Sequence, residues 1–145
     1  MEKLEWILSG PDYHVYYFEK NKEAVYAKIL EMNRILDRNR IKFRVVILPV
    51  FPQDARSYDD YPLFEIHEEI RNFLAKSHIR FLDLLPSFYK QGKAPRNFAY
   101  DIWHPNSQGH RLIAQQLLSF LLLEEDPRQN LTKIVRHHSS CIKHM

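Results

Sequence analysis

Residues 43–48 read Phe-Arg-Val-Val-Ile-Leu, a short and nearly continuous apolar run that ends at Pro49. β-branched side chains favour extended backbone, and a run that is apolar on both faces predicts a strand buried in a parallel sheet. A second run at residues 79–84 reads Ile-Arg-Phe-Leu-Asp-Leu and ends at Pro86. Two parallel strands near 43–48 and 79–84 therefore predict an α/β fold.

The segment between these strands predicts the helix that connects them. From about Leu63 to Lys76, the apolar positions 66, 70, 73 and 74 recur at helical spacing. Strand, crossover helix and strand form a unit with a right-handed connection and parallel strands. A parallel sheet needs several strands and cover on both faces, so we expect only part of a three-layer α/β/α domain here.

Two more helices are expected, one before this unit and one after it. Asn21 could cap a helix that runs to about Arg38, whereas the aromatic, β-prone segment 13–18 before it stays ambiguous. A last helix over about 107–123 is apolar on most of its surface, so we expect it to pack heavily. We therefore expect residues 1–123 to form the domain portion and residues 124–145 to form a polar, basic and disordered tail.

Composition and charge exclude several classes of function. The 145 residues, 45% of them hydrophobic, predict one globular domain. The net charge of +3 is accounted for by the tail, and no basic stripe indicates a nucleic-acid partner. Three glycines are too few for a phosphate-binding loop or a dinucleotide fingerprint, so nucleotide chemistry is not expected.

Membrane, secretion and cysteine signals are also weak. The longest apolar run, Leu117–Leu123, is interrupted by Ser119 and is too short to span a membrane. The N-terminus has an acidic start and a short apolar patch, which is not typical of a secretory signal, and the compartment stays open. The single Cys141 excludes an internal disulfide and a paired-cysteine metal motif.

The candidate chemistry lies in residues 101–110, which read Asp-Ile-Trp-His-Pro-Asn-Ser-Gln-Gly-His. A carboxylate at Asp101 can hydrogen-bond one imidazole nitrogen of His104 and leave the other free to take a proton. Pro105 restricts the backbone of His104 to extended angles, and Asn106 can cap the helix behind it. Asp101 and His104 are therefore two-thirds of a nucleophilic triad.

This block resembles the last conserved block of the SGNH, or GDSL-type, ester hydrolases. The residues that carry the resemblance are Asp101, His104, Pro105, Asn106, Gly109 and His110, with Ala114 further on. The strand-helix-strand order upstream is similar to the C-terminal half of bacterial members, over roughly residues 20–123. The resemblance implies a flavodoxin-like fold and hydrolysis of small-molecule acyl esters by a Ser-His-Asp triad.

Residue by residue, the resemblance implies that Asp101 orients His104, which acts as general base and then as general acid. Pro105, Asn106 and Gly109 would support the site, with Gly109 allowing a close approach of neighbouring chain. His110 would have a structural role only.

The sequence departs from the family at its front half. The Gly-Asp-Ser block that brings the nucleophile has no counterpart here, and neither do the glycine and asparagine blocks of the oxyanion hole. Ser9 has a glycine beside it, but the surrounding residues do not match. Loss of one oxyanion donor alone costs on the order of 10²–10³ in rate. We therefore expect a truncated or split form that is inactive alone.

Other readings compete with the triad. Asp101, His104 and His110 are residue types that suit zinc, but no fourth ligand is spaced to join them, so no metal or other cofactor is expected. His67 is followed by two glutamates but lacks the second histidine of a metalloprotease motif, and we expect it at the surface or half-buried. Asp83 is expected to cap the turn that follows it, and the aspartates at 54, 59 and 60 to lie in a solvated loop.

A rival from another class is a non-catalytic module. The predicted sheet has an open edge, and such an edge can pair with a strand from a partner chain or a second copy. In the hydrolase hypothesis the missing front half of the domain completes the sheet, whereas in the module hypothesis a partner chain or a second copy does.

Overall fold

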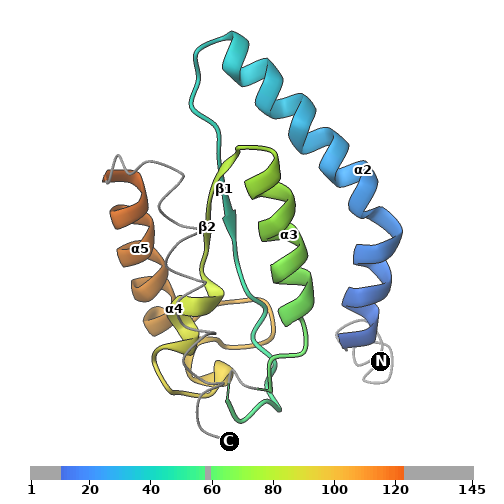
Figure 1. Cartoon of the computed structure of the whole chain (residues 1–145). Coiled ribbons are helices and arrows are strands. Elements are labelled where there is room, and N and C mark those ends of the chain that lie inside the picture. Colours follow the sequence, from blue (N-terminus) through green and yellow to red (C-terminus); the bar gives the residue numbers. More distant parts are fainter. Residues whose placement is uncertain (1–10, 58–59, 123–145) are drawn as a thin grey trace, which may run out of the picture.

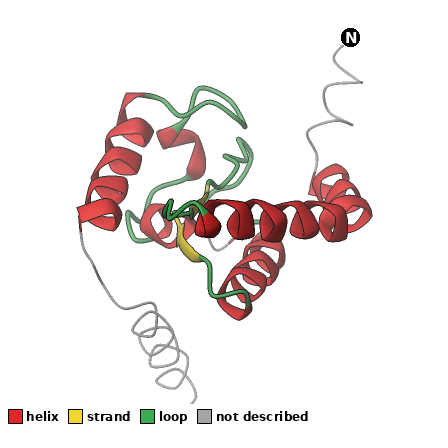
Figure 2. Cartoon of the chain, turned by 90° about the horizontal axis from the view of Figure 1, so that it is seen from above, coloured by secondary structure: helices red, strands yellow, loops and turns green. Residues whose placement is uncertain are grey.

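The computed structural model describes residues 11–57 and 60–122 of the chain (Figure 1). It is a mixed α/β structure, mostly helical, with a small parallel sheet at its centre (Figure 2). The elements follow one another as α2 (Pro11–Arg38), β1 (Arg44–Ile47), α3 (Phe64–Lys76), β2 (Arg80–Asp83), α4 (Leu85–Tyr89), the 3₁₀ helix η2 (Pro95–Phe98) and α5 (Ser107–Leu122).

The sheet consists of β1 and β2, which pair in parallel from Arg44 opposite Arg80 to Ile47 opposite Asp83. The amide of Leu84 donates to the carbonyl oxygen of Ile47 at 3.0 Å and extends the pairing beyond the strands. Both predicted strands and their parallel direction are therefore confirmed. Within the described residues, β1 has β2 as its only strand partner.

Helices cover both faces of this strand pair. Val45, Ile47 and Phe81 belong to an apolar cluster that includes Leu74 of α3. Alternate residues of the same strands, such as Val46 and Leu82, pack against a second cluster that includes Leu112 of α5. The alternation follows from the period of two in a strand. In Figure 1, α5 accordingly lies to the left of the strands and α3 to the right, with α2 outside α3.

The first described helix begins earlier than the sequence predicted. α2 starts at Pro11, a residue that is tolerated in a first helical turn because its missing N–H has no helical partner there. Asn21 is not a cap but an internal residue, whose side chain donates to the carbonyl oxygen of Tyr17 at 2.7 Å. The aromatic segment 13–18 is helical, with the rings of Tyr13 and Tyr17 one turn apart and 4.5 Å between centroids. Contacts between aromatic side chains at this spacing override their β propensity.

Two short helices, α4 and η2, lie where the sequence predicted only a strand end and a loop. Prolines occupy their first turns, because a fixed φ suits a helix start. Both helices bring a buried aromatic ring to the core: Phe88 meets Phe51 at 5.2 Å and Phe98 at 5.3 Å between centroids, all edge to face. This aromatic row of Phe51, Phe88 and Phe98 lies next in sequence and space to the segment 99–106.

α5 has the predicted bounds as far as Leu122, but the expectation of heavy packing on most of its surface is wrong. Gly109 and Leu112 are buried against the rest of the domain, whereas Leu118, Leu121 and Leu122 are exposed. A single helix face meets the sheet, and the remaining leucines have no described neighbour that covers them. The predicted tail 124–145 and the end of the helix at residue 123 lie outside the described residues. Among the helices described, none has the length and apolarity to cross a membrane.

Gly109→Ala should destabilise the domain by about 1–3 kcal/mol, the range for forcing an extra methyl group into a packed site. A Cβ at this position would overlap the carbonyl oxygen of Phe98 and press on the Pro105 ring. Urea unfolding followed by circular dichroism would measure the change in free energy of unfolding. Gln108→Ala, at an exposed position of the same turn, is the control and should change it by less than about 0.5 kcal/mol. Equal midpoints for the two variants would contradict the close approach.

Candidate functional site

The segment that carries Asp101 and His104 is a closed loop. Ala99 and Pro105 form an antiparallel bridge, in which the amide of Tyr100 donates to the carbonyl oxygen of His104 at 2.8 Å. The amide of Asn106 then donates to the carbonyl oxygen of Phe98 at 2.9 Å. Backbone hydrogen bonds therefore close the loop of residues 100–104 at its base, next to Phe98 of the aromatic row.

Within the loop, the Asp101 carboxylate organises the turn around itself. Its Oδ1 accepts the backbone N–H groups of Trp103 at 2.7 Å and of His104 at 2.8 Å. Aspartate is favoured in turns because its short side chain can accept such amides. The imidazole of His104 lies against the same carboxylate, with Nδ1 at 2.7 Å from Oδ2 and 2.9 Å from Oδ1. The side chain of one residue thus fixes both the backbone and the ring of the other.

This contact decides which imidazole nitrogen is available. An ionised carboxylate only accepts hydrogen bonds, so Nδ1 of His104 carries a proton, and in the neutral imidazole Nε2 then presents its lone pair. Nε2 has no hydrogen-bond partner among residues 11–57 and 60–122. The side chain of His104 is 74% exposed and that of Asp101 is 51% exposed. An Asp–His pair in this form can take a proton from a hydroxyl group brought to Nε2.

The same contact lowers the pKa of Asp101. The hydrogen bond from the His104 side chain is the largest cause, followed by the amides of Trp103 and His104. All three favour the ionised carboxylate. Asp101 therefore remains an acceptor to lower pH than an ordinary aspartate.

The predicted supporting residues have the contacts expected of them. Asn106 caps α5, because its Oδ1 accepts the amides of Gln108 at 2.9 Å and Gly109 at 3.1 Å. The position of Gly109 against Phe98 and Pro105 has no room for a side chain. His110 is exposed on the first turn of α5, and its amide donates to the carbonyl oxygen of Asn106 at 2.8 Å. These contacts fix the start of α5 directly behind His104.

A nucleophile does not accompany this pair in the described part of the chain. No hydrogen bond there joins a serine hydroxyl to His104. Ser9 lies outside the described residues. Residues 11–57 and 60–122 also contain no group of three or more metal-ligating side chains that could hold an ion. His104 and Asp101 are therefore a two-residue site in this structure.

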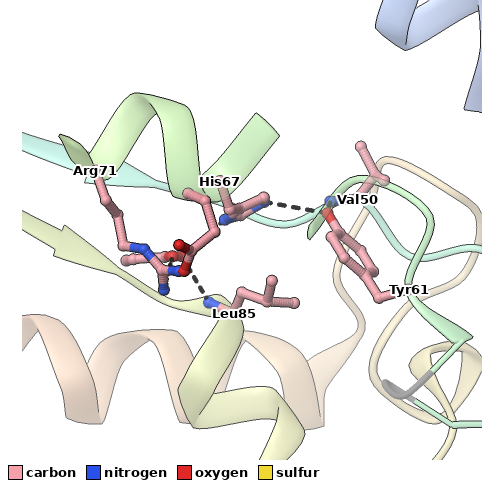
Figure 3. A network of polar contacts seen from close by, with 7 residues as sticks. Val50, Tyr61, His67, Arg71 and Leu85 are labelled. Carbon is pink, nitrogen blue, oxygen red and sulfur yellow. Dashed lines mark hydrogen bonds and ion pairs between the residues drawn. The ribbon is translucent and has the colours of Figure 1, made fainter. Parts of the chain in front are cut away.

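A second polar cluster lies inside the protein, and sequence reasoning missed it (Figure 3). His67 of α3 was expected at the surface or half-buried, but it is only 4% exposed. Its Nδ1 lies 2.9 Å from Oδ1 of Asp83, and its Nε2 lies 3.1 Å from the hydroxyl of Tyr61. A signal was present in the sequence, because His67 is seven residues before Leu74 and shares its buried helix face.

Asp83 at the end of β2 is the centre of this cluster. Its Oδ1 accepts the amide of Leu85 at 3.0 Å, so Asp83 binds the turn that follows the strand, whereas the cap residue of α4 is Leu84. Its Oδ2 accepts from Arg71 of α3 at 3.2 Å, and Arg71 also pairs with Glu68. The loop aspartates were expected in solvent, and Asp54 and Asp60 are exposed, while residue 59 is outside the described range.

An open apolar pocket of about 210 Å³ lies between α2, the end of β1 and α3. Its walls include His14 and Phe18 of α2 and Leu48 after β1. The ring of His14 also meets the ring of Trp103 at 4.9 Å, so α2 contacts the loop of the Asp–His pair.

No protein-family model, curated protein or solved structure gives a significant match to this chain.

Replacing His104 should raise the pKa of Asp101. His104→Gln removes the imidazole contact that contributes most to the lowered pKa, while the two backbone amides remain. A carboxyl with a lowered folded-state pKa stabilises the fold above its unfolded pKa of about 3.9, and this contribution is lost as pH falls through the folded value. Carboxyl ¹³C NMR titration of Asp101 would measure the change. His110→Gln is the control that keeps the pair, and the same Asp101 pKa in both variants would contradict the contact.

Proposed function

We propose that this chain is the C-terminal portion of an SGNH-type ester hydrolase domain with a flavodoxin-like, three-layer α/β/α fold. It contributes Asp101 and His104 to a Ser-His-Asp triad whose serine comes from sequence outside this chain. The observation that carries the proposal is the paired geometry: Nδ1 of His104 lies 2.7 Å from the Asp101 carboxylate, and Nε2 points to no described partner. The reaction class is acyl transfer to water.

The position of the pair in the fold supports the same proposal. Ligands of open parallel sheets bind beyond the carboxyl ends of the strands. The amide of Phe51, four residues after the end of β1, donates to the carbonyl oxygen of Ile102 at 2.9 Å. The loop after β1 and the loop of the pair therefore meet beyond the end of β1. A serine from a further strand of the same sheet would approach His104 from this end.

The chemistry follows from the tautomer. Nε2 of His104 takes the proton as the serine oxygen attacks the ester carbonyl, and Asp101 stabilises the imidazolium that results. The imidazolium then gives this proton to the leaving alkoxide, and an acyl-serine remains. Water, deprotonated by the same nitrogen, then attacks the acyl group, and the bond to the serine oxygen breaks as the imidazolium returns the proton to that oxygen, which releases the acid and restores the serine. No cofactor enters any of these steps.

The chain alone should have no esterase activity, because the nucleophile and the oxyanion donors are elsewhere. Fused behind the front half of an SGNH esterase, the full chain should contribute to hydrolysis of p-nitrophenyl acetate. Asp101→Asn should lower kcat on the order of 10⁴-fold, since an amide favours the wrong tautomer of His104. His104→Ala should abolish measurable turnover.

His110→Ala is the matched control, because this histidine is exposed six residues away and is outside the pair. It should keep the activity of the parent fusion. Turnover that survives His104→Ala as well as it survives His110→Ala would refute the assignment.

The second candidate is a non-catalytic module that completes its sheet with another chain. In the described part of the chain β1 pairs with β2 alone, which favours this candidate, and Leu48 directly after β1 is 55% exposed. The pocket beside Leu48 offers more apolar surface to an added strand. A self-associating strand at this edge would give a dimer.

Sedimentation velocity would test this candidate, with a dimer as the expected species. Leu48→Lys should shift the protein to monomer, because a charge at the rim of the added strand is costly to bury. Leu118→Lys, an equally exposed leucine on α5, should leave the dimer intact. A well-folded wild-type monomer would remove the need for a second copy.

A further inference from the structure

Asp101 and His104 are exposed side chains on a loop, so their alignment depends on the backbone beneath them. The critical unit is the peptide that joins Ile102 to Trp103. Its N–H donates to Oδ1 of Asp101 at 2.7 Å, and its carbonyl oxygen accepts the amide of Phe51 at 2.9 Å. A peptide is planar, so fixing its oxygen also fixes the direction of its N–H. The contact from Phe51 therefore orients the N–H that binds the Asp101 carboxylate.

The position of the Phe51 amide is fixed in turn by contacts with buried side chains. The preceding residue, Val50, donates its N–H to the hydroxyl oxygen of Tyr61 at 3.2 Å. The ring of Phe51 is buried and packs edge to face against the ring of Phe88. The segment 50–51 is thus held by the Tyr61 hydroxyl, by the Gln53 side chain, which donates to the Phe51 carbonyl oxygen at 2.7 Å, and by the ring contact with Phe88.

Tyr61 is fixed in turn by His67 and Asp83 (Figure 3). Burial raises the pKa of the Tyr61 hydroxyl, so it stays protonated and can donate. The hydroxyl lies 3.1 Å from Nε2 of His67, and it donates to this nitrogen in the tautomer whose proton is on Nδ1. Nδ1, which carries that proton, lies 2.9 Å from Oδ1 of Asp83 and donates to it. Every donor in this sequence of contacts meets an acceptor.

Asp83, the last residue in this series of contacts, is held by an ion pair and by burial. The side chain of Asp83 is 4% exposed and is neutralised by Arg71 of α3 at 3.2 Å. A buried carboxylate is retained only when it is paired and hydrogen-bonded. The anchor therefore joins β2 and α3 through the contacts of Asp83 with His67 and Arg71.

We propose that Tyr61, His67 and Asp83 are positioning residues for the Asp101–His104 pair, acting through the amides of Val50 and Phe51. This inference rests on the proposed function for its catalytic meaning, but the positioning itself can be measured without catalysis. The buried Tyr-His-Asp array does not touch substrate. It sets the orientation of the Ile102–Trp103 peptide and, with it, the tautomer of His104.

The first test uses the wild-type protein and needs no variant to fold. If one array holds the loop, a single opening releases the amides of Val50, Phe51 and Trp103 together. Native-state hydrogen exchange measured by NMR should then give these three amides the same opening constant within about threefold. A Trp103 amide that opens a hundred times more often than those of Val50 and Phe51 would overturn the proposal.

The second test removes only the hydroxyl group. Tyr61→Phe should speed exchange at Phe51 and Trp103 by about five- to tenfold, the effect of losing one ordinary hydrogen bond. It should also lower the fraction of neutral His104 with its proton on Nδ1, read from imidazole ¹⁵N shifts at mildly alkaline pH. Tyr100→Phe is the control: its ring is exposed beside Asp101, and the variant should match the wild type in both readouts.

The tautomer separates positioning from mere structural support. Tyr61→Phe with faster exchange at Phe51 but an unchanged His104 tautomer would overturn the proposal, because the array would then stabilise only the fold. Asp101→Asn in the same spectra should remove the Nδ1–H preference and so identifies the pair itself. Failure of the fusion esterase would count against the proposed function, whereas these two NMR readouts would still decide the positioning.

Discussion

The buried carboxylate of Asp83 is the contact on which much of the rest of the structure depends. It ends β2, starts α4 through the amide of Leu85, and binds His67 and Arg71 of α3. Because a carboxylate in an apolar interior is unfavourable without partners, these contacts must form together. The strand, the following helix and the crossover helix are thereby fixed relative to one another at the carboxyl end of the sheet, where the candidate site lies.

Two kinds of contact connect Asp83 to the loop of the Asp101–His104 pair. The polar array through His67 and Tyr61 reaches the backbone at Val50. The next residue, Phe51, packs its ring in the aromatic row with Phe88 and Phe98. The array directs hydrogen bonds, which depend on angle, whereas the three rings of the aromatic row are buried and exclude water. Neither alone would hold a loop whose functional side chains are in solvent.

The sequence predicted the strands, the connecting helix and the Asp–His pair because each rests on short-range patterns. Apolar runs ending at Pro49 and Pro86 defined β1 and β2, and the spacing from Asp101 to Gly109 defined the loop and its cap. What it missed depends on long-range contacts. The burial of His67 follows from Asp83, sixteen residues away, and Tyr61, and the helical state of segment 13–18 follows from ring packing that residue propensities do not encode. The exposed leucines of α5 likewise depend on which elements surround that helix.

If the chain is part of a larger hydrolase domain, as we propose, the geometry of the pair also explains how the site can be preformed. Asp101 binds two amides within three residues and the imidazole of the same segment, so its direct contacts are local, and the contact from Phe51 orients the peptide that carries one of these amides. The bridge from Ala99 to Pro105 and the Asn106 cap are equally local. In the described part of the chain, the backbone hydrogen bond from Phe51 to Ile102 links this loop to the segment after β1. An added front half would therefore meet an imidazole whose free nitrogen is already presented, and would need to supply the nucleophile and the oxyanion donors rather than reorganise the base.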